Sequence, residues 1–135
     1  MANVAYPLGL QVFLTAGLDW SSAGVNIKAI LVTSSYTYSS AHQFISDIPG
    51  GDIVVRSGNL ASKSATAGVA NAANITITAV SGPAANAFIL AHDTGTDSTS
   101  PLLTYTDTGT NLPITPNGGD ITIAWDTGAN KIFRL

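Results

Sequence analysis

The chain lacks several features that would narrow its function. It has no cysteine among 135 residues, which excludes disulfides and thiolate metal sites. Charged residues make up only 10% of the chain, well below the roughly 25% of an average globular domain. No apolar run approaches the roughly 20 residues of a membrane-spanning helix, and no basic segment precedes the first apolar residues. We therefore expect neither membrane insertion nor a secretion signal.

Positive charge is also scarce. The formal net charge is -3, and no basic cluster of the kind that binds phosphates is visible. The cations are Lys28, Arg56, Lys63, Lys131 and Arg134. Hydrophobic residues nevertheless make up 45% of the chain, which argues against disorder. We expect one folded domain over residues 1–135, with a surface of Ser, Thr, Asn and Gly and no affinity for nucleic acid.

Short apolar runs separated by turn residues predict a domain made mainly of β-strands. The most β-branched run, residues 27–33, is expected to form a central strand. The other expected strands are 53–55, 75–80, 88–91, 102–105, 120–125 and 132–133, with a weaker candidate at 60–66. This spacing favours a single β-sandwich or jelly-roll-like domain.

Residues 6–20 are the one segment where a helix competes with a strand. Pro7 suits the first position of a helix, and Gly17 suits its end. A helix would place Leu10, Phe13 and Leu14 on one face. A strand over residues 10–15 remains the alternative, so we expect at most one short helix, at the N-terminal end.

The sequence Asp-Thr-Gly occurs three times, beginning at Asp93, Asp107 and Asp126. The last copy looks like the active-site turn of aspartic proteases, in which two carboxylates share a proton. The chain after Asp126 is too short for the segments that would bury such a turn. Asp and Gly are also the residues that tight turns require, so turns are favoured.

Other candidate chemistry is weaker. The acidic loop 93–100 could hold a cation through Asp93 and Asp97, but it lacks the spacing of a calcium loop. His42 and His92 have no metal-site spacing. Neither a Gly-x-Ser-x-Gly elbow nor a phosphate-binding loop is present. We expect no catalytic residue, no cofactor and no metal site.

A polar and aromatic segment, residues 34–46, carries the candidate partner-binding residues Tyr36, Tyr38, His42 and Phe44. Amphipathic rings are favoured at interfaces, where they anchor a protein or stack on a glycan. Packing in the core or at its rim explains the two tyrosines equally well.

Residues 27–48 resemble a family of small virion proteins of tailed bacteriophages. The matching elements are Ile-Lys-x-x-Leu-Val-Thr-Ser-x-Tyr-Thr and His-x-Phe-x-Ser-Asp, preceded by the turn Leu18-Asp19-Trp20. Residues 93–102, before Leu-x-x-Tyr-x-Asp, and the strand at 119–125 resemble the same family. The likeness covers most of the chain from Leu8 on and departs at the alanine-rich residues 61–74.

The resemblance implies a structural role and brings no catalytic residue with it. It implies a capsid decoration, or cement, protein on the virion surface, whose partner is the major capsid protein or another virion protein. A symmetric homo-oligomer is expected, with a trimer favoured, and loops 34–46 and 111–119 would bridge neighbours. The alternatives are a tail- or fibre-associated structural protein and a receptor- or glycan-binding module.

Overall fold

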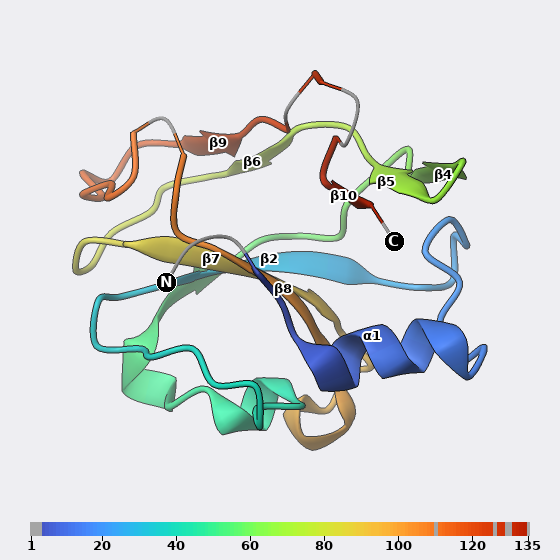
Figure 1. The fold of residues 1–135 in the computed structure, drawn as a ribbon. Helices are drawn as coiled ribbons and strands as arrows, with labels where there is room; N and C mark the ends of the chain where they lie inside the picture. The colour runs from blue at the N-terminus through green and yellow to red at the C-terminus, as the bar shows by residue number, and fades with distance from the viewer. Residues whose placement is uncertain (1–3, 110, 126, 129–130, 135) are drawn as a thin grey trace.

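A five-stranded antiparallel sheet forms the middle of the molecule in the computed structural model, which describes residues 4–109, 111–125, 127–128 and 131–134 (Figure 1). The strands are β1 (Val4–Ala5), β2 (Ile27–Val32), β3 (Ile53–Arg56), β4 (Ser64–Thr66), β5 (Val69–Asn71), β6 (Ile75–Ile77), β7 (Ala87–His92), β8 (Leu102–Thr106), β9 (Ile121–Ile123) and β10 (Phe133–Arg134). The helices are α1 (Pro7–Leu14) and the 3₁₀ turns η1 (Ile45–Asp47), η2 (Gly50–Asp52) and η3 (Asp97–Thr99). None of these described helices could cross a membrane.

The central sheet has the strand order β1-β8-β7-β2-β3. β2 pairs with β7 along its whole length, from Ile27 opposite His92 to Val32 opposite Ala87. Five of the six β2 residues are buried, because both faces of the sheet are covered. The expected all-β domain with one short helix is confirmed, and the apolar run at 27–33 does form an interior strand. The expected jelly-roll connectivity is not established by these sheet orders.

The alternation of side chains along these strands divides the buried residues into two cores, one on each face of the sheet. The upper core, above the sheet in Figure 1, consists of Leu18, Trp20, Ile27, Ala29, Leu31, Leu60, Ala70, Ala72, Ile77, Val80, Ala85, Leu90, Leu103, Ile121 and Ile123. The lower core consists of Tyr6, Ile30, Val32, Tyr36, Ile45, Ile48, Ala87, Ile89, Ala91, Leu102 and Tyr105.

Two small sheets cover the upper core. One has the strand order β10-β5-β4 and the other pairs β6 with β9 (Figure 1). The strand expected at 75–80 ends early, because Ala79 has a left-handed φ of 52° and the Val80 N–H bonds to the Gly119 carbonyl. Of the weak candidate at 60–66, only β4 is a strand.

Irregular chain covers the lower core instead. Residues 33–52, which include η1 and η2, run beneath the sheet in Figure 1, with the η3 loop beside them. Backbone hydrogen bonds join this segment to the start of β8, from the Ile45 N–H to the Ser100 carbonyl and from the Leu102 N–H to the Gln43 carbonyl. These bonds satisfy backbone groups that a regular layer would pair within itself.

Helix α1 closes one end of the sheet. Pro7 stands in its first turn, as predicted. Gly9 is needed where the helix meets β8, because a Cβ there would overlap the Leu102 carbonyl. Ala16, with a φ of 59°, rather than Gly17 takes the left-handed conformation after the helix. The expected apolar face is wrong for Leu14, whose side chain is 86% exposed.

Strand β8 changes the face to which its side chains point. Its register against β7 shifts between Leu90 and Ala91, as at a β-bulge. Leu103 and Tyr105 are two residues apart and would otherwise share a face. The irregularity places Leu103 in the upper core and Tyr105 in the lower core.

Candidate partner-binding surface

All four tyrosines of the chain gather at the lower face of the sheet, together with one histidine. We call Tyr6, Tyr36, Tyr38, Tyr105 and His42 the tyrosine cluster. Ring centroids lie 4.9 Å apart for Tyr6 and Tyr38, 5.8 Å for Tyr38 and Tyr105, and 6.0 Å for Tyr36 and Tyr105. Tilted rings at these separations attract one another in addition to the apolar area they bury. The cluster thereby joins residues 36–42 to β8 and to the residue that precedes α1.

A chain of hydrogen bonds crosses the cluster. The hydroxyls of Tyr6 and Tyr36 are 2.7 Å apart, and the Tyr36 hydroxyl is 2.7 Å from Nδ1 of His42. Burial and the neighbouring Tyr36 hydroxyl raise the pKa of Tyr6 far above its ordinary value. Burial likewise raises the pKa of Tyr36. Both phenols therefore stay neutral over the range in which proteins are folded, and they act as hydrogen-bonding groups.

The four residues predicted to bind a partner come from one segment but differ in exposure. Tyr36 is buried, at 5% exposure, and its hydroxyl already has two partners. Tyr38 is half-buried and donates its hydroxyl to the Ala5 carbonyl. His42 and Phe44 are half-buried as well, and Phe44 forms an isolated bridge with Pro101. Tyr36 therefore positions the segment, while the other three retain surface for an external contact.

Asp47 holds the turn that follows His42. Its Oδ2 accepts hydrogen bonds from the N–H groups of Gln43 at 2.8 Å and Phe44 at 2.9 Å. These two bonds lower the pKa of Asp47 below its ordinary value. Sequence reasoning missed this residue, although an acidic side chain at the third position of a helical turn is a signal for such a cap.

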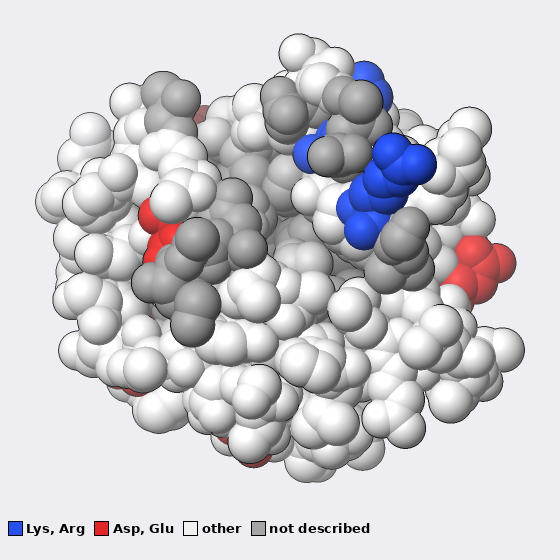
Figure 2. Space-filling view, in the orientation of Figure 1, with Lys and Arg blue, Asp and Glu red and all other residues white. Residues whose placement is uncertain are grey.

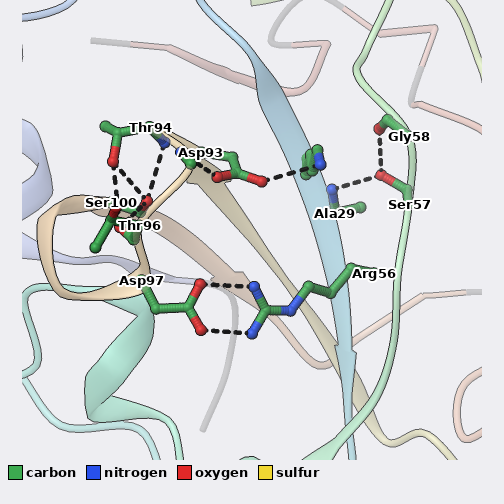
Figure 3. Close-up of polar contacts among 11 residues, drawn as sticks. Ala29, Arg56, Ser57, Gly58, Asp93, Thr94, Thr96, Asp97 and Ser100 are labelled. Atoms are coloured by element: carbon green, nitrogen blue, oxygen red, sulfur yellow. Dashed lines mark hydrogen bonds and ion pairs between the residues drawn. The ribbon is translucent and has the colours of Figure 1, made fainter.

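The acidic loop 93–100 is tied to the sheet by two ion pairs (Figure 3). Asp93 lies 2.9 Å from Nζ of Lys28 on β2. The carboxylate of Asp97 forms a bidentate ion pair with the guanidinium of Arg56 on β3, and both N–O distances are 2.8 Å. The bond from the Gly95 N–H and the ammonium of Lys28 lower the pKa of Asp93, and Arg56 lowers that of Asp97. Both candidate cation ligands are thus engaged with side chains of the sheet.

Ser100 lies inside this loop and bonds to its backbone. It is fully buried, and its hydroxyl donates to the Thr96 carbonyl at 2.7 Å and accepts from the Thr94 N–H at 3.0 Å (Figure 3). These bonds close the loop on itself and hold Asp97 toward Arg56. Across the residues that the structure describes, no group of three or more His, Asp or Glu side chains could hold a metal ion.

Of the three Asp-Thr-Gly copies, the structure describes the first two whole. In the first copy, Asp93 accepts the Gly95 N–H at 2.8 Å and Gly95 has a φ of 94°, which is the turn geometry expected from the sequence. The second copy, at Asp107, follows the end of β8. Asp126, the start of the third copy, lies outside the described residues.

His92 ends β7 opposite Ile27 and is half-buried. Burial and the nearby ammonium of Lys63 lower its pKa below the ordinary value. At neutral pH the His92 imidazole is therefore uncharged. The other predicted contact loop, 111–119, is held by paired backbone bonds between Ala85 and Ile114.

No protein-family model matches the chain, and no curated protein matches it. A function has to be inferred from the chain's own residues.

Proposed function

We propose that this chain is a non-enzymatic structural protein of a tailed-bacteriophage virion. In this proposal it is a decoration protein that binds the outside of the assembled capsid shell as a homo-oligomer, with a trimer favoured. The support comes from the sequence, in which residues 27–48, 93–102 and 119–125 resemble such virion proteins. The scarcity of charge and the abundance of hydroxyl side chains suit a surface that packs against neighbouring subunits.

The observation that carries the proposal is the order imposed on residues 34–46. The tyrosine cluster fixes this segment from the sheet side, Asp47 fixes its turn, and backbone bonds tie it to β8. A loop that is already ordered before binding loses little conformational entropy when a partner docks. The half-buried side chains of Tyr38, His42 and Phe44 are the proposed contacts with the capsid.

A decoration protein would stabilise a shell by mass action. Because it binds the assembled lattice and not the free subunits, each bound copy shifts the equilibrium toward the lattice. Contact through several copies of an oligomer would raise the effective affinity without any new kind of contact. No catalytic group is needed for this role.

Location in the particle tests the proposal directly. Cryo-electron microscopy of the virion is expected to show density for this fold on the capsid lattice, with residues 34–46 facing the shell or a neighbouring copy. Density confined to the tail would overturn the decoration role and favour the tail-associated alternative.

A binding assay tests the contact surface. Purified protein is expected to co-sediment with assembled shells and not with free capsid subunits. Ser40 and Ser81 are both exposed, and only Ser40 lies in the proposed surface. Ser40→Arg should abolish co-sedimentation, whereas the matched control Ser81→Arg should retain it. Equal binding by both variants would exclude residues 34–46 as the contact.

A further inference from the structure

A cleft of about 600 Å³ opens between the central sheet and the upper layer, at the β1 edge of the sheet, and residues of β1, β7, β8 and β10 line it. Its volume falls in the range of roughly 300–1,000 Å³ that small-molecule sites occupy. Most of the cleft lining lies on the other side of the sheet from the tyrosine cluster, and Tyr105 is the one member of that cluster that also borders the cleft. Figure 2 shows a hollow on this face with blue side chains beside it, over β10.

Three of the five cations lie away from this cleft and are already bonded to other groups. Lys28 and Arg56 are paired with Asp93 and Asp97. The Lys63 ammonium donates to the backbone carbonyls of Ser22 and Val25, and burial lowers its pKa.

The two remaining cations, Lys131 and Arg134, both line the cleft. Lys131 donates to the carbonyl of Thr127, a neutral acceptor. Within the described part of the chain, neither cation has a carboxylate partner. Because no carboxylate of the described residues pairs with them, their positive charge suits the cleft to an anion.

The walls add two further features. Phe88 and Trp125 meet edge to face at the cleft, with ring centroids 5.8 Å apart. The threonines Thr104 and Thr106 project from β8 into the same lining. Thr104 is 8% exposed and Thr106 is half-buried. Hydroxyls that line an open cleft can exchange bound water for the donors and acceptors of a ligand.

We infer that this cleft binds an acidic sugar, meaning a saccharide that carries a phosphate or carboxylate group. Lys131 and Arg134 would hold the anionic group, the threonine hydroxyls would bond to sugar hydroxyls, and the rings of Phe88 and Trp125 would pack on the C–H face of the sugar. A purely apolar ligand would leave the cations and hydroxyls without partners, which costs binding energy. This inference stands apart from the proposed virion role, and either can fail alone.

The test uses glucose 6-phosphate, with glucose and inorganic phosphate as single-feature probes, in an NMR titration of the full chain. The chain has two tryptophans, which gives an internal control. The indole N–H signal of Trp125 should move with glucose 6-phosphate, while that of Trp20 should stay. Weak binding, with a Kd on the order of 1 mM, is sufficient for detection.

Charge variants decide whether the cations are responsible. The double variant Lys131→Gln/Arg134→Gln should weaken binding of glucose 6-phosphate by about tenfold or more, as the loss of charge-assisted hydrogen bonds does. Arg56→Gln also removes positive charge from an exposed side chain, but away from the cleft, and should bind like the unaltered protein. Circular dichroism establishes that each variant is folded. If the double variant is unfolded, Thr106→Val provides the second test and should weaken binding severalfold.

Three outcomes overturn the inference. One is a Trp125 signal that does not move with glucose 6-phosphate at 20 mM, roughly twenty times the expected Kd. Another is equal affinity in the folded charge variant, or in Thr106→Val where that variant is used. The third is that inorganic phosphate or glucose binds as tightly as glucose 6-phosphate. That result would show that the cleft does not recognise a sugar and an anionic group together.

Discussion

The two faces of the central sheet are covered in contrasting ways. Above it, two small sheets bury a core made almost wholly of aliphatic side chains. Below it, an irregular segment and two 3₁₀ turns lie on a core rich in tyrosine. Regular strands pair their own backbone groups, whereas irregular chain needs other partners for them. Tyrosine suits the lower face because it contributes apolar area and a hydroxyl together.

This contrast shows that one set of strands can support two kinds of packing. Ile89 and Leu90 are adjacent on β7 and both fully buried, yet they belong to different cores. The aliphatic side should depend on volume, and the tyrosine side on the pairing of hydroxyls. The four predictions below test that difference, from the largest expected effect to the smallest.

Gly9→Ala should have the largest effect, because it disturbs the contact of α1 with β8, and α1 packs Val12 and Phe13 against the upper core. The added Cβ would overlap the backbone carbonyl of Leu102, so α1 must move away from β8. We expect the free energy of unfolding to fall by more than about 4 kcal/mol, measured by urea denaturation. The matched control is Gly58→Ala, where a Cβ meets nothing within 4 Å, and there the change should stay below about 0.5 kcal/mol. Equal stability of the two variants would contradict the proposed helix contact.

Leu90→Ala tests the aliphatic side. Its side chain is fully buried in the upper core, and truncation should cost about 2–5 kcal/mol through lost transfer energy and a residual cavity. Leu14→Ala is the same chemical change at an exposed position, so its cost should be within about 0.5 kcal/mol. Thermal unfolding of the two variants measures the difference. A similar cost for both would mean that the upper core is loosely packed.

Tyr36→Phe tests the tyrosine side by removing one hydroxyl and almost no volume. The Tyr6 hydroxyl, which is fully buried, then loses its partner, and this should cost about 1–3 kcal/mol. Tyr6→Phe removes a hydroxyl from the same bond but leaves Tyr36 bonded to His42, so we expect a smaller cost of about 1 kcal/mol. Chemical denaturation of both variants gives the order. The reverse order would contradict the pairing described for the lower core.

Asp97→Asn should have the smallest effect, and one that depends on pH. Arg56 lowers the pKa of folded Asp97 below the value of about 3.9 in an unfolded chain. The ion pair therefore contributes its full stability above about pH 4, and that contribution is lost as the pH falls through the folded pKa. Because the pair is exposed, the contribution should be below about 1 kcal/mol. Urea unfolding from pH 2 to 7 should show that the free energies of unfolding of the unaltered protein and the variant converge in acid. A difference that stays constant with pH would refute the ion pair as its cause.

Most of the strands could be predicted because their signals are local, whereas β1 and β5 were not predicted and the N-terminal segment was left open between helix and strand. The β-branched run of β2, the polar loop between β7 and β8, and Pro7 at the start of α1 each specify a conformation within a few residues. The errors arose where tertiary contacts overrode that local signal. Leu14 fits the helical period, yet α1 meets β8 through Gly9, which turns Leu14 to solvent.

The candidate surface was only partly visible in the sequence, because its supports come from distant segments. Tyr36, Tyr38 and His42 are close in sequence, but Tyr6 and Tyr105 join them only through the fold. Likewise, Asp97 was considered as a cation ligand because nothing local indicates that Arg56 lies opposite it. No spacing rule links residues that meet across three strands, so such contacts need the structure.

The hydrogen-bond chain through Tyr6, Tyr36 and His42 also has a direction. Tyr6 is fully buried and its hydroxyl has no other partner among the described residues, so its proton points to the Tyr36 oxygen. The Tyr36 proton must then point to Nδ1 of His42, which accepts it. That assignment fixes the imidazole tautomer, with its proton on Nε2. A phenol buried in the core thus dictates that the half-buried histidine can offer a partner a donor, and never an acceptor, through Nε2.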